Sequence, residues 1–147
     1  MGNSITSQEN VFLGFTPDEI VKLYKFLYAF EKVESYKSDE RFKQDYPVLS
    51  ASLYEVFKSL DLRAENHVSI IQEIDKVRYT DAHRQKYMAF LYHLRNSIAH
   101  GYIRKGEDIE IKDLWQGSFS ASGHISPNKF ELIINAINST LINNLPL

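Results

Sequence analysis

Hydrophobic residues spaced three and four positions apart predict helices over most of the chain, because that spacing places them on one face of a helix. The segments that show it are 17–36, 38–46, 48–60, 65–77, 80–100 and a final helix from 127 onward. Of these, 65–77 has the weakest pattern, which rests on Val68, Ile71 and Ile74. Pro47 separates two neighbouring segments, since the residue before a proline avoids helical angles.

Helix starts and ends carry their own signals. Thr16 and Glu19 form a capping box around Pro17, and proline suits the first helical position. Thr80 is expected to cap the helix that runs to residue 100, and Gly101 is placed to end it in a left-handed conformation. The apolar stripe of that helix, which should face the core, is Tyr87, Phe90, Leu91, Leu94 and Ile98.

The pattern after Gly101 changes to a period of two, the alternation of a β-strand. Residues 102–104 and 109–111 flank a turn and predict a β-hairpin, and 119–126 is expected to add a third short strand. The fold class expected is therefore mainly α, a helical bundle of four to five helices with a small β-hairpin and a C-terminal helix. The chain 1–147 is expected to form a single domain, in which 1–15 is a partly mobile segment whose apolar end, 11–15, docks on the core.

The composition narrows the setting of the protein. The 147 residues contain no cysteine, which excludes disulfides and thiolate zinc sites and fits the cytoplasm. No apolar run approaches the roughly 20 residues that a membrane span needs, so no membrane association is expected. No histidine pair or carboxylate cluster has the spacing of a metal site, so neither a metal nor another cofactor is expected.

Basic residues gather in one stretch of the chain. The net charge is −2, but residues 76–105 hold seven basic residues against one acidic residue, a net charge of +6 that leaves −8 for the rest. A local basic zone is what a phosphate ligand requires. Acidic residues from elsewhere in the chain would equally neutralise this zone in space, and the sequence leaves both interpretations open.

The last turn of the helix before the hairpin carries the candidate chemistry. Residues 94–101 read Leu-Arg-Asn-Ser-Ile-Ala-His-Gly, with Arg95, Asn96 and His100 close together. At roughly 100° per residue, an ideal helix puts His93, Asn96 and His100 in one polar row and turns Arg95 away from it. Asn96 is therefore expected to hydrogen-bond the ring of His100, while Arg95 would join them through a distorted helix end or from a second subunit.

This string and the pattern around it, over roughly 80–115, resemble the R-x4-6-H motif of the HEPN superfamily. Arg95, Asn96 and His100 match that motif residue by residue. The resemblance implies a small helical protein of the stand-alone bacterial HEPN toxin type, a metal-independent endoribonuclease of toxin–antitoxin or other defence systems. It also implies a homodimer in which two motif helices meet across a two-fold axis and form one composite cleft.

The residue types suit RNA cleavage. RNA carries its own nucleophile, the 2′-hydroxyl, so cleavage needs a base, an acid and a cation to stabilise charge on the phosphate. Histidine titrates near neutral pH, and arginine stays charged and grips phosphate oxygens. The catalytic residues expected are Arg95, His100 and Asn96, and RNA contacts are expected from Arg95, His93, Arg104 and Lys105.

The expected dimer would bury the helix face that carries Tyr92, Arg95 and Ala99, which points away from the core stripe. Tyr102 completes the string R-x4-H-x-Y, and the resemblance implies that this tyrosine is modified with AMP by a nucleotidyltransferase-type antitoxin. Gly101 and the strand pattern that follows it depart from that subgroup of HEPN toxins. Tyr102 packed on the core within the hairpin is therefore the alternative.

Other interpretations of the motif remain open. Without a function, Arg95 would pair with an acidic neighbour and His100 would help to end the helix. The second functional hypothesis is a HEPN-fold module that binds RNA or a protein without cleaving it, and the third is a structural dimer subunit of a larger complex. A cleavage assay with and without a chelator separates the ribonuclease from the other two.

Overall fold

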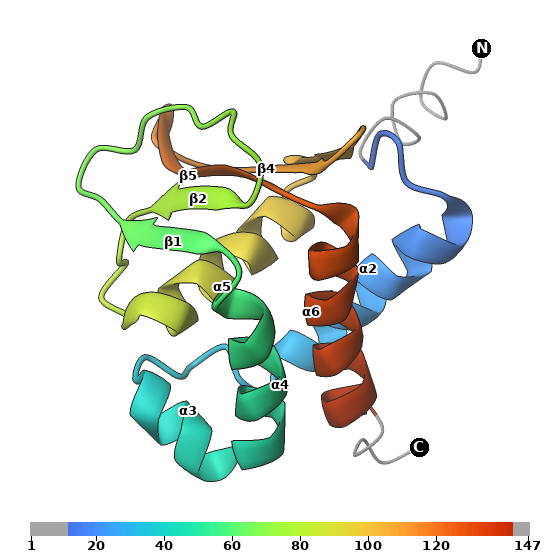
Figure 1. Ribbon diagram of the computed structural model, residues 1–147, viewed down its shortest axis with the longest axis vertical. Helices are drawn as coiled ribbons and strands as arrows, with labels where there is room; N and C mark the ends of the chain where they lie inside the picture. Colours follow the sequence, from blue (N-terminus) through green and yellow to red (C-terminus); the bar gives the residue numbers. More distant parts are fainter. Residues whose placement is uncertain (1–11, 143–147) are drawn as a thin grey trace.

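The computed structural model describes residues 12–142 and shows two layers, a β-sheet and a group of helices packed on one of its faces (Figure 1). The helices are α2 (Pro17–Phe30), α3 (Asp39–Asp45), α4 (Pro47–Phe57), α5 (Lys86–Ala99) and α6 (Pro127–Leu141). The strands are β1 (Asp61–Ala64), β2 (Lys76–Tyr79), β3 (Ile103–Lys105), β4 (Ile109–Trp115) and β5 (Ser118–Ile125). Buried side chains of both layers form a single hydrophobic core.

The expectation of a mainly α bundle is wrong, because the described residues form a five-stranded mixed sheet beside the helices. The strand order is β1-β2-β5-β4-β3; β1 and β2 run parallel, and the other neighbouring pairs are antiparallel. The expected hairpin is present as β3 and β4, the expected third strand as β5, and the final helix as α6. Strands β1 and β2 were not expected, and they extend the three expected strands to a five-stranded sheet.

The segment 65–77 does not form the expected helix, because its apolar residues have different surroundings in the sheet. Val77 lies in β2 and is fully buried. Ile71 is buried, and its N–H donates to the hydroxyl of Ser122 at 3.0 Å, whereas Ile74 is 56% exposed. The contacts of two short strands thus override a weak helical spacing, as tertiary packing often does.

The helix boundaries before the sheet follow local signals. Helix α2 begins at Pro17, and both hydrogen bonds of the Thr16–Glu19 capping box are present. The helix ends at Phe30 rather than at residue 36, and the chain continues in turns. Tyr46, directly before the proline that starts α4, has a φ of −132° and separates α3 from α4, which confirms the expected break.

Helix α5 begins at Lys86, later than expected, because its cap comes from a distant part of the chain. Thr80 does not cap it; the Thr80 N–H donates to a carbonyl of β5 at 2.9 Å and so extends the sheet. Instead the Asp39 carboxylate accepts hydrogen bonds from the N–H groups of Tyr87 and Met88 at 3.2 and 3.0 Å. Its negative charge also complements the positive end of the helix dipole.

The core side of α5 matches the expected stripe. Phe90, Leu91, Leu94 and Ile98 are fully buried, and Tyr87 is half-buried. Gly101 follows the helix with a φ of 72°, which confirms the expected left-handed end. No helix in the described part of the chain has the length and apolar character needed to cross a bilayer.

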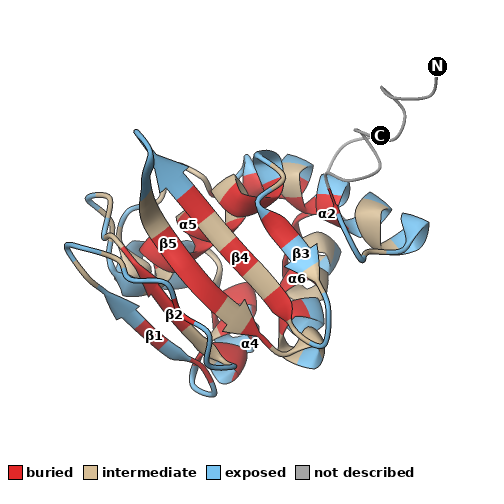
Figure 2. Ribbon diagram, turned by 90° about the horizontal axis from the view of Figure 1, so that it is seen from above, coloured by how far each residue is buried: buried red, intermediate tan, exposed pale blue. Residues whose placement is uncertain are grey.

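The face of β3 and β4 away from the helices is open, and Figure 2 looks onto the sheet from that side. Along β4, Ile109, Ile111 and Asp113 are buried, whereas the alternate residues Glu110 and Lys112 are only half-buried. This alternation is typical of a sheet with one covered face. The segment 12–15 borders the edge of β3 and contributes buried Phe12 to the core; residue 11 and the rest of the expected N-terminal segment lie outside the described residues.

Candidate functional site

The motif residues lie at the C-terminal end of α5, where the helix reaches the surface. Arg95 and Asn96 are half-buried, whereas Ala99 and His100 are exposed. His100 is the C-cap residue, with φ −96° and ψ 2°, and its backbone N–H still donates to the Asn96 carbonyl at 3.0 Å. The fold therefore presents the motif to solvent at the junction between the central helix and the sheet.

A buried hydrogen-bond network lies directly behind the motif. Asp113 on β4 is 5% exposed, and its Oδ2 accepts from the side-chain amide of Asn96 at 3.0 Å and lies 2.8 Å from Nδ1 of His93. The other ring nitrogen of His93 lies 2.8 Å from the carbonyl oxygen of Thr80 and 3.1 Å from its hydroxyl. Since an ionised carboxylate only accepts, Nδ1 of His93 donates to Asp113, whereas the Thr80 hydroxyl can donate to Nε2 or accept from it.

The network keeps Asp113 ionised. Burial alone would raise the pKa of Asp113, but the hydrogen bonds from His93 and Asn96 outweigh it and hold the pKa below its ordinary value. A buried carboxylate with two side-chain donors is a rigid anchor, because moving either donor would leave a charge without its partner in an apolar surrounding.

Two expectations for the polar row of α5 are wrong. The Asn96 amide donates to Asp113 and not to the ring of His100, which has left the helical path as the cap residue. The ring of His93 points into the core side of the sheet and is 2% exposed, so RNA does not reach it in this conformation. A spacing of three or four residues places these side chains in one row of the helix. Their hydrogen-bond partners, however, depend on the sheet that packs against that row.

Arg95 is held from two sides. Its Nε lies 3.3 Å from a carboxylate oxygen of Glu34, in the turn after α2, and its Nη1 donates to the side-chain oxygen of Asn96 at 3.2 Å. Its side chain is still 33% exposed, so one edge of the guanidinium faces solvent. Arg95 therefore does pair with an acidic residue, as the alternative interpretation expected. The sequence did not identify Glu34 as that residue, because it lies far from Arg95 along the chain.

His100 is free of the buried network. Its ring stacks on that of Tyr102, with centroids 6.2 Å apart and planes inclined by 11°. Within residues 12–142 its ring nitrogens have no hydrogen-bond partner, and no hydrogen bond or ion pair joins His100 to Arg95. Tyr102 is 43% exposed, so its ring is accessible rather than packed in the core. Within one chain, the side chains of Arg95 and His100 are therefore not joined to each other.

The dimer face expected on α5 is partly covered in the single chain. Tyr92 is half-buried, and the guanidinium of Arg84 lies 4.1 Å from the centre of its ring. Arg84 is fixed there by hydrogen bonds to the backbone carbonyls of Glu34 and Tyr36. Ala99, between Arg95 and His100 in the motif, is exposed.

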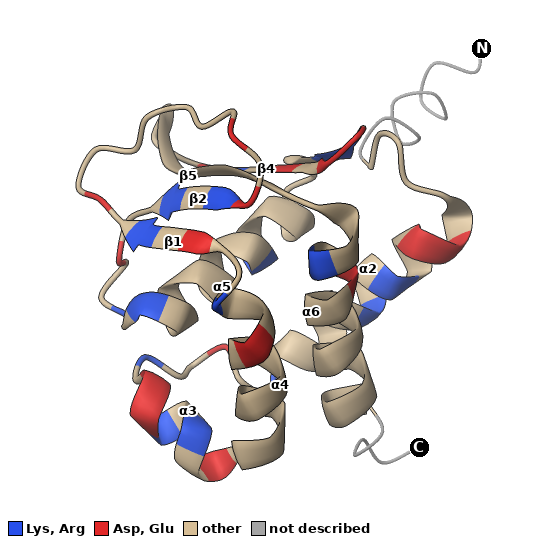
Figure 3. Ribbon diagram, viewed as in Figure 1, with Lys and Arg blue, Asp and Glu red and all other residues tan. Residues whose placement is uncertain are grey.

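The basic stretch over 76–105 is largely neutralised in space, as one of the two interpretations expected. Carboxylates lie within ion-pair distance of five of its seven cations: Lys76 with Glu73, Arg78 with Asp61 and Glu65, Arg95 with Glu34, Arg104 with Glu110, and Lys105 with Glu19. Acidic and basic residues also occur together on α2, α3 and β1 instead of separating onto two ends of the molecule (Figure 3). A broad basic surface is therefore not what marks this site.

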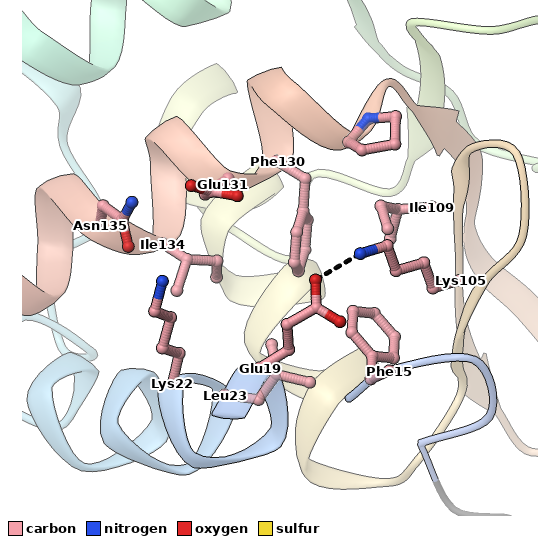
Figure 4. A pocket seen from close by; sticks show the side chains of 11 residues that line it. Phe15, Glu19, Lys22, Leu23, Lys105, Ile109, Phe130, Glu131, Ile134 and Asn135 are labelled. Carbon is pink, nitrogen blue, oxygen red and sulfur yellow. Dashed lines mark hydrogen bonds and ion pairs between the residues drawn. The ribbon is translucent and has the colours of Figure 1, made fainter. Parts of the chain in front are cut away.

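Lys105, an expected RNA contact, points away from the motif toward α2. It pairs with Glu19 at the mouth of a small cavity between α2, α6 and the β3–β4 turn (Figure 4). The hydrogen bond from Lys105 lowers the pKa of Glu19. The cavity measures about 50 Å³, little more than the roughly 30 Å³ that one water occupies in the liquid. Lys105 acts here as a link between the sheet and α2.

Residues 12–142 contain no group of three or more histidine, cysteine or acidic side chains arranged to hold a metal ion. Comparisons of the chain with protein-family models, with curated protein sequences and with solved structures gave no match. The site must therefore be interpreted from its own geometry and from the resemblance of its motif.

Proposed function

We propose that this chain is a metal-independent endoribonuclease of the HEPN type, with Arg95, Asn96 and His100 as its catalytic residues. The observation that carries the proposal is the end of α5, where Asp113 holds Asn96, Asn96 and Glu34 hold Arg95, and His100 remains exposed and unbonded within the described residues. A positioned guanidinium can stabilise charge on the phosphate and an accessible imidazole can transfer a proton, which are roles that cleavage by a 2′-hydroxyl requires.

The proposed reaction forms a bond from the 2′-oxygen to the adjacent phosphorus and breaks the bond from that phosphorus to the next 5′-oxygen. One imidazole takes the proton of the 2′-hydroxyl, and a second, protonated imidazole gives a proton to the departing 5′-oxygen. Arg95 stabilises the charge that builds on the non-bridging oxygens. The products are a 2′,3′-cyclic phosphate and a 5′-hydroxyl end.

Two imidazoles require two copies of His100, so the proposal includes a homodimer with a composite cleft. The faces of α5 with Tyr92, Arg95 and Ala99 would meet across the two-fold axis. Ala99 supports this arrangement because it is exposed and small, which allows two helices to approach closely. The Arg95 of one chain would then lie close to the His100 of the partner chain, although it is not joined to the His100 of its own chain.

The biological setting rests on the HEPN resemblance and not on a contact in the structure. We propose a toxin or defence effector that acts on RNA in the cytoplasm and is restrained by an antitoxin of the nucleotidyltransferase type. Tyr102 would be the residue that receives AMP, and its 43% exposure supports access to it.

A second function, RNA or protein binding without cleavage, is favoured by the ion pair between Arg95 and Glu34. That pair occupies part of the guanidinium that catalysis would use. In this case the end of α5 would recognise a ligand, and His100 would make a contact instead of moving a proton.

The test is cleavage of single-stranded RNA by the purified protein with and without a chelator. We expect cleavage in both, with 2′,3′-cyclic phosphate ends. His100→Ala and Arg95→Ala should each lower the rate by about a hundred- to ten-thousand-fold, and Asn96→Ala by less, since it orients Arg95. The matched controls are His67→Ala and Arg63→Ala, which change exposed residues of the same types away from the motif.

Mixing the parent with an excess of the His100→Ala variant tests the composite cleft. A mixed dimer keeps both arginines but only one of the two imidazoles, so cleavage by the parent should fall as mixed dimers form, whereas an excess of His67→Ala should not lower it. Lack of any cleavage by the parent, together with salt-dependent RNA binding, would favour the binding module. Equal cleavage by parent and both variants would show that the site is misassigned.

A further inference from the structure

A groove lies beside His100 on the open face of the sheet. It has a volume of about 220 Å³, several times the roughly 30 Å³ that one water occupies in the liquid. Its lining comes from the start of the hairpin and its neighbours: Leu13, Gly101, Tyr102, Ile103, Arg104, Glu110 and Lys112. Tyr102 and Lys112 are neighbours on adjacent segments, because the Lys112 N–H donates to the Tyr102 carbonyl at 3.0 Å. The groove therefore adjoins the proposed cleft.

The ring of Tyr102 forms one wall of this groove and lies nearly parallel to the ring of His100. The rings of Tyr102 and His100 are inclined by only 11°, and Tyr102 is 43% exposed. A planar base that stacks on Tyr102 would lie parallel to the histidine as well. Its sugar and phosphate would then extend toward His100, where the proposed reaction needs them.

The polar wall carries more positive than negative charge. Arg104 and Lys112 lie 2.7 and 3.7 Å from the same carboxylate, that of Glu110, and their side chains are 59% and 39% exposed. His124 also faces Glu110, at 3.7 Å. Because two full cations share one carboxylate, the groove can accept one further anion such as a phosphate.

We infer that this groove binds the nucleotide next to the cleaved phosphate in single-stranded RNA, with its base on Tyr102 and its other phosphate, the one that is not cleaved, at Arg104 and Lys112. The identity of the ligand rests on the proposed function, but the groove adds a binding site that the motif does not include. Lys112 takes the place expected for Lys105, which is committed to Glu19. Duplex RNA fits poorly, because its bases are already stacked on each other.

The test uses a single-stranded RNA whose 2′-hydroxyls are methylated, so that it binds but cannot be cut. Tyr102→Ala should weaken binding about tenfold, and Tyr102→Phe should leave it unchanged, because stacking needs the ring and not the hydroxyl. Arg104→Ala and Lys112→Ala should each reduce the slope of affinity against salt by about one. Tyr28→Ala is the matched control, since Tyr28 is 60% exposed but lies on α2.

With unmethylated, cleavable RNA the same variants separate the groove from the catalytic groups. Tyr102→Ala should raise KM with kcat near that of the parent, whereas His100→Ala should lower kcat. If the parent binds the methylated RNA through Tyr102 but cuts no RNA, the groove stands and the ribonuclease proposal fails. If the parent cuts RNA and Tyr102→Ala changes neither binding nor KM, the groove is wrong and the ribonuclease stands.

Three further results would overturn the groove by themselves. The first is that the parent does not bind the methylated strand. The second is that a blunt duplex of the same sequence competes as well as the single strand. The third is that Tyr28→Ala loses as much binding as Tyr102→Ala. The near-native melting temperature expected for Tyr102→Phe and Tyr102→Ala shows that a loss of binding is not a loss of fold.

Discussion

The ring of His93 and the carboxylate of Asp113, twenty residues apart in sequence, lie 2.8 Å apart in the interior and tie helix α5 to strand β4. The same carboxylate oxygen accepts from Asn96, which in turn accepts from Arg95. The position of the proposed catalytic arginine therefore depends on a buried hydrogen-bond network in the core. The exposed His100 has no such support.

Replacing Asp113 with asparagine should destabilise the protein strongly. The amide keeps the shape of the side chain but removes the charged carboxylate that accepts from His93 and Asn96, and a hydrogen bond to a charged group typically contributes about 1.5–3 kcal/mol. Urea denaturation at pH 7 would measure the loss. Asp81→Asn is the control, since Asp81 is an exposed aspartate, and it should change stability little.

The effect of Asp113→Asn should depend on pH in one direction. The pKa of Asp113 is lowered in the folded chain from its ordinary value of 3.8, so its contribution to stability is complete well above pH 3.8. It is lost as the pH falls through 3.8 toward the lower folded value, where the carboxyl becomes protonated in both states. Melting curves of parent and variant should converge below pH 3.8; a gap that widens toward acid would contradict the assignment.

Gly14→Ala should also destabilise the fold. Gly14 has a φ of 88°, and a Cβ there would overlap the carbonyl oxygen of Lys105, which the segment 12–15 packs against. The left-handed conformation alone costs about 1–2 kcal/mol for an alanine. Thermal melting against Gly106→Ala gives the comparison, because a Cβ at Gly106 meets nothing within 4 Å. Equal melting temperatures for both variants would show that residues 12–15 do not dock.

Leu94→Ala should cost about 2–5 kcal/mol, because Leu94 is fully buried on the core side of α5. Leu132 on α6 is 55% exposed, so Leu132→Ala should have little effect. Denaturant midpoints of the two variants and the parent measure the difference. A small loss for Leu94→Ala would mean that α5 is not the central helix of the core.

Ala99→Trp should disrupt the proposed dimer and, with it, RNA cleavage. A large side chain at an exposed alanine would prevent the close approach of two α5 helices. Sedimentation velocity should give a dimer for the parent and a monomer for the variant. Ala51→Trp introduces the same bulk at an exposed alanine of α4 and should remain dimeric. A monomeric parent at micromolar concentration would exclude the composite cleft.

The sequence by itself determined the features whose signals are local. The capping box of Thr16 and Glu19, the break before Pro47, the left-handed end at Gly101 and the hairpin that follows are all decided by neighbours a few residues apart. The exposed end of α5 was predictable for the same reason. Helical periodicity predicted the core-facing stripe of α5, and the motif residues follow from it because they occupy the neighbouring positions of the same helix.

Only the tertiary structure decided the sheet and the partners of the site. Strands β1 and β2 have four residues each, too few to show a clear alternation, and they become strands because each pairs with a neighbour in the sheet. Asp39 caps α5, Asp113 holds Asn96, and Glu34 pairs with Arg95, all from distant positions. Hydrogen bonds and ion pairs of this kind depend on distances in space that leave no period in the sequence.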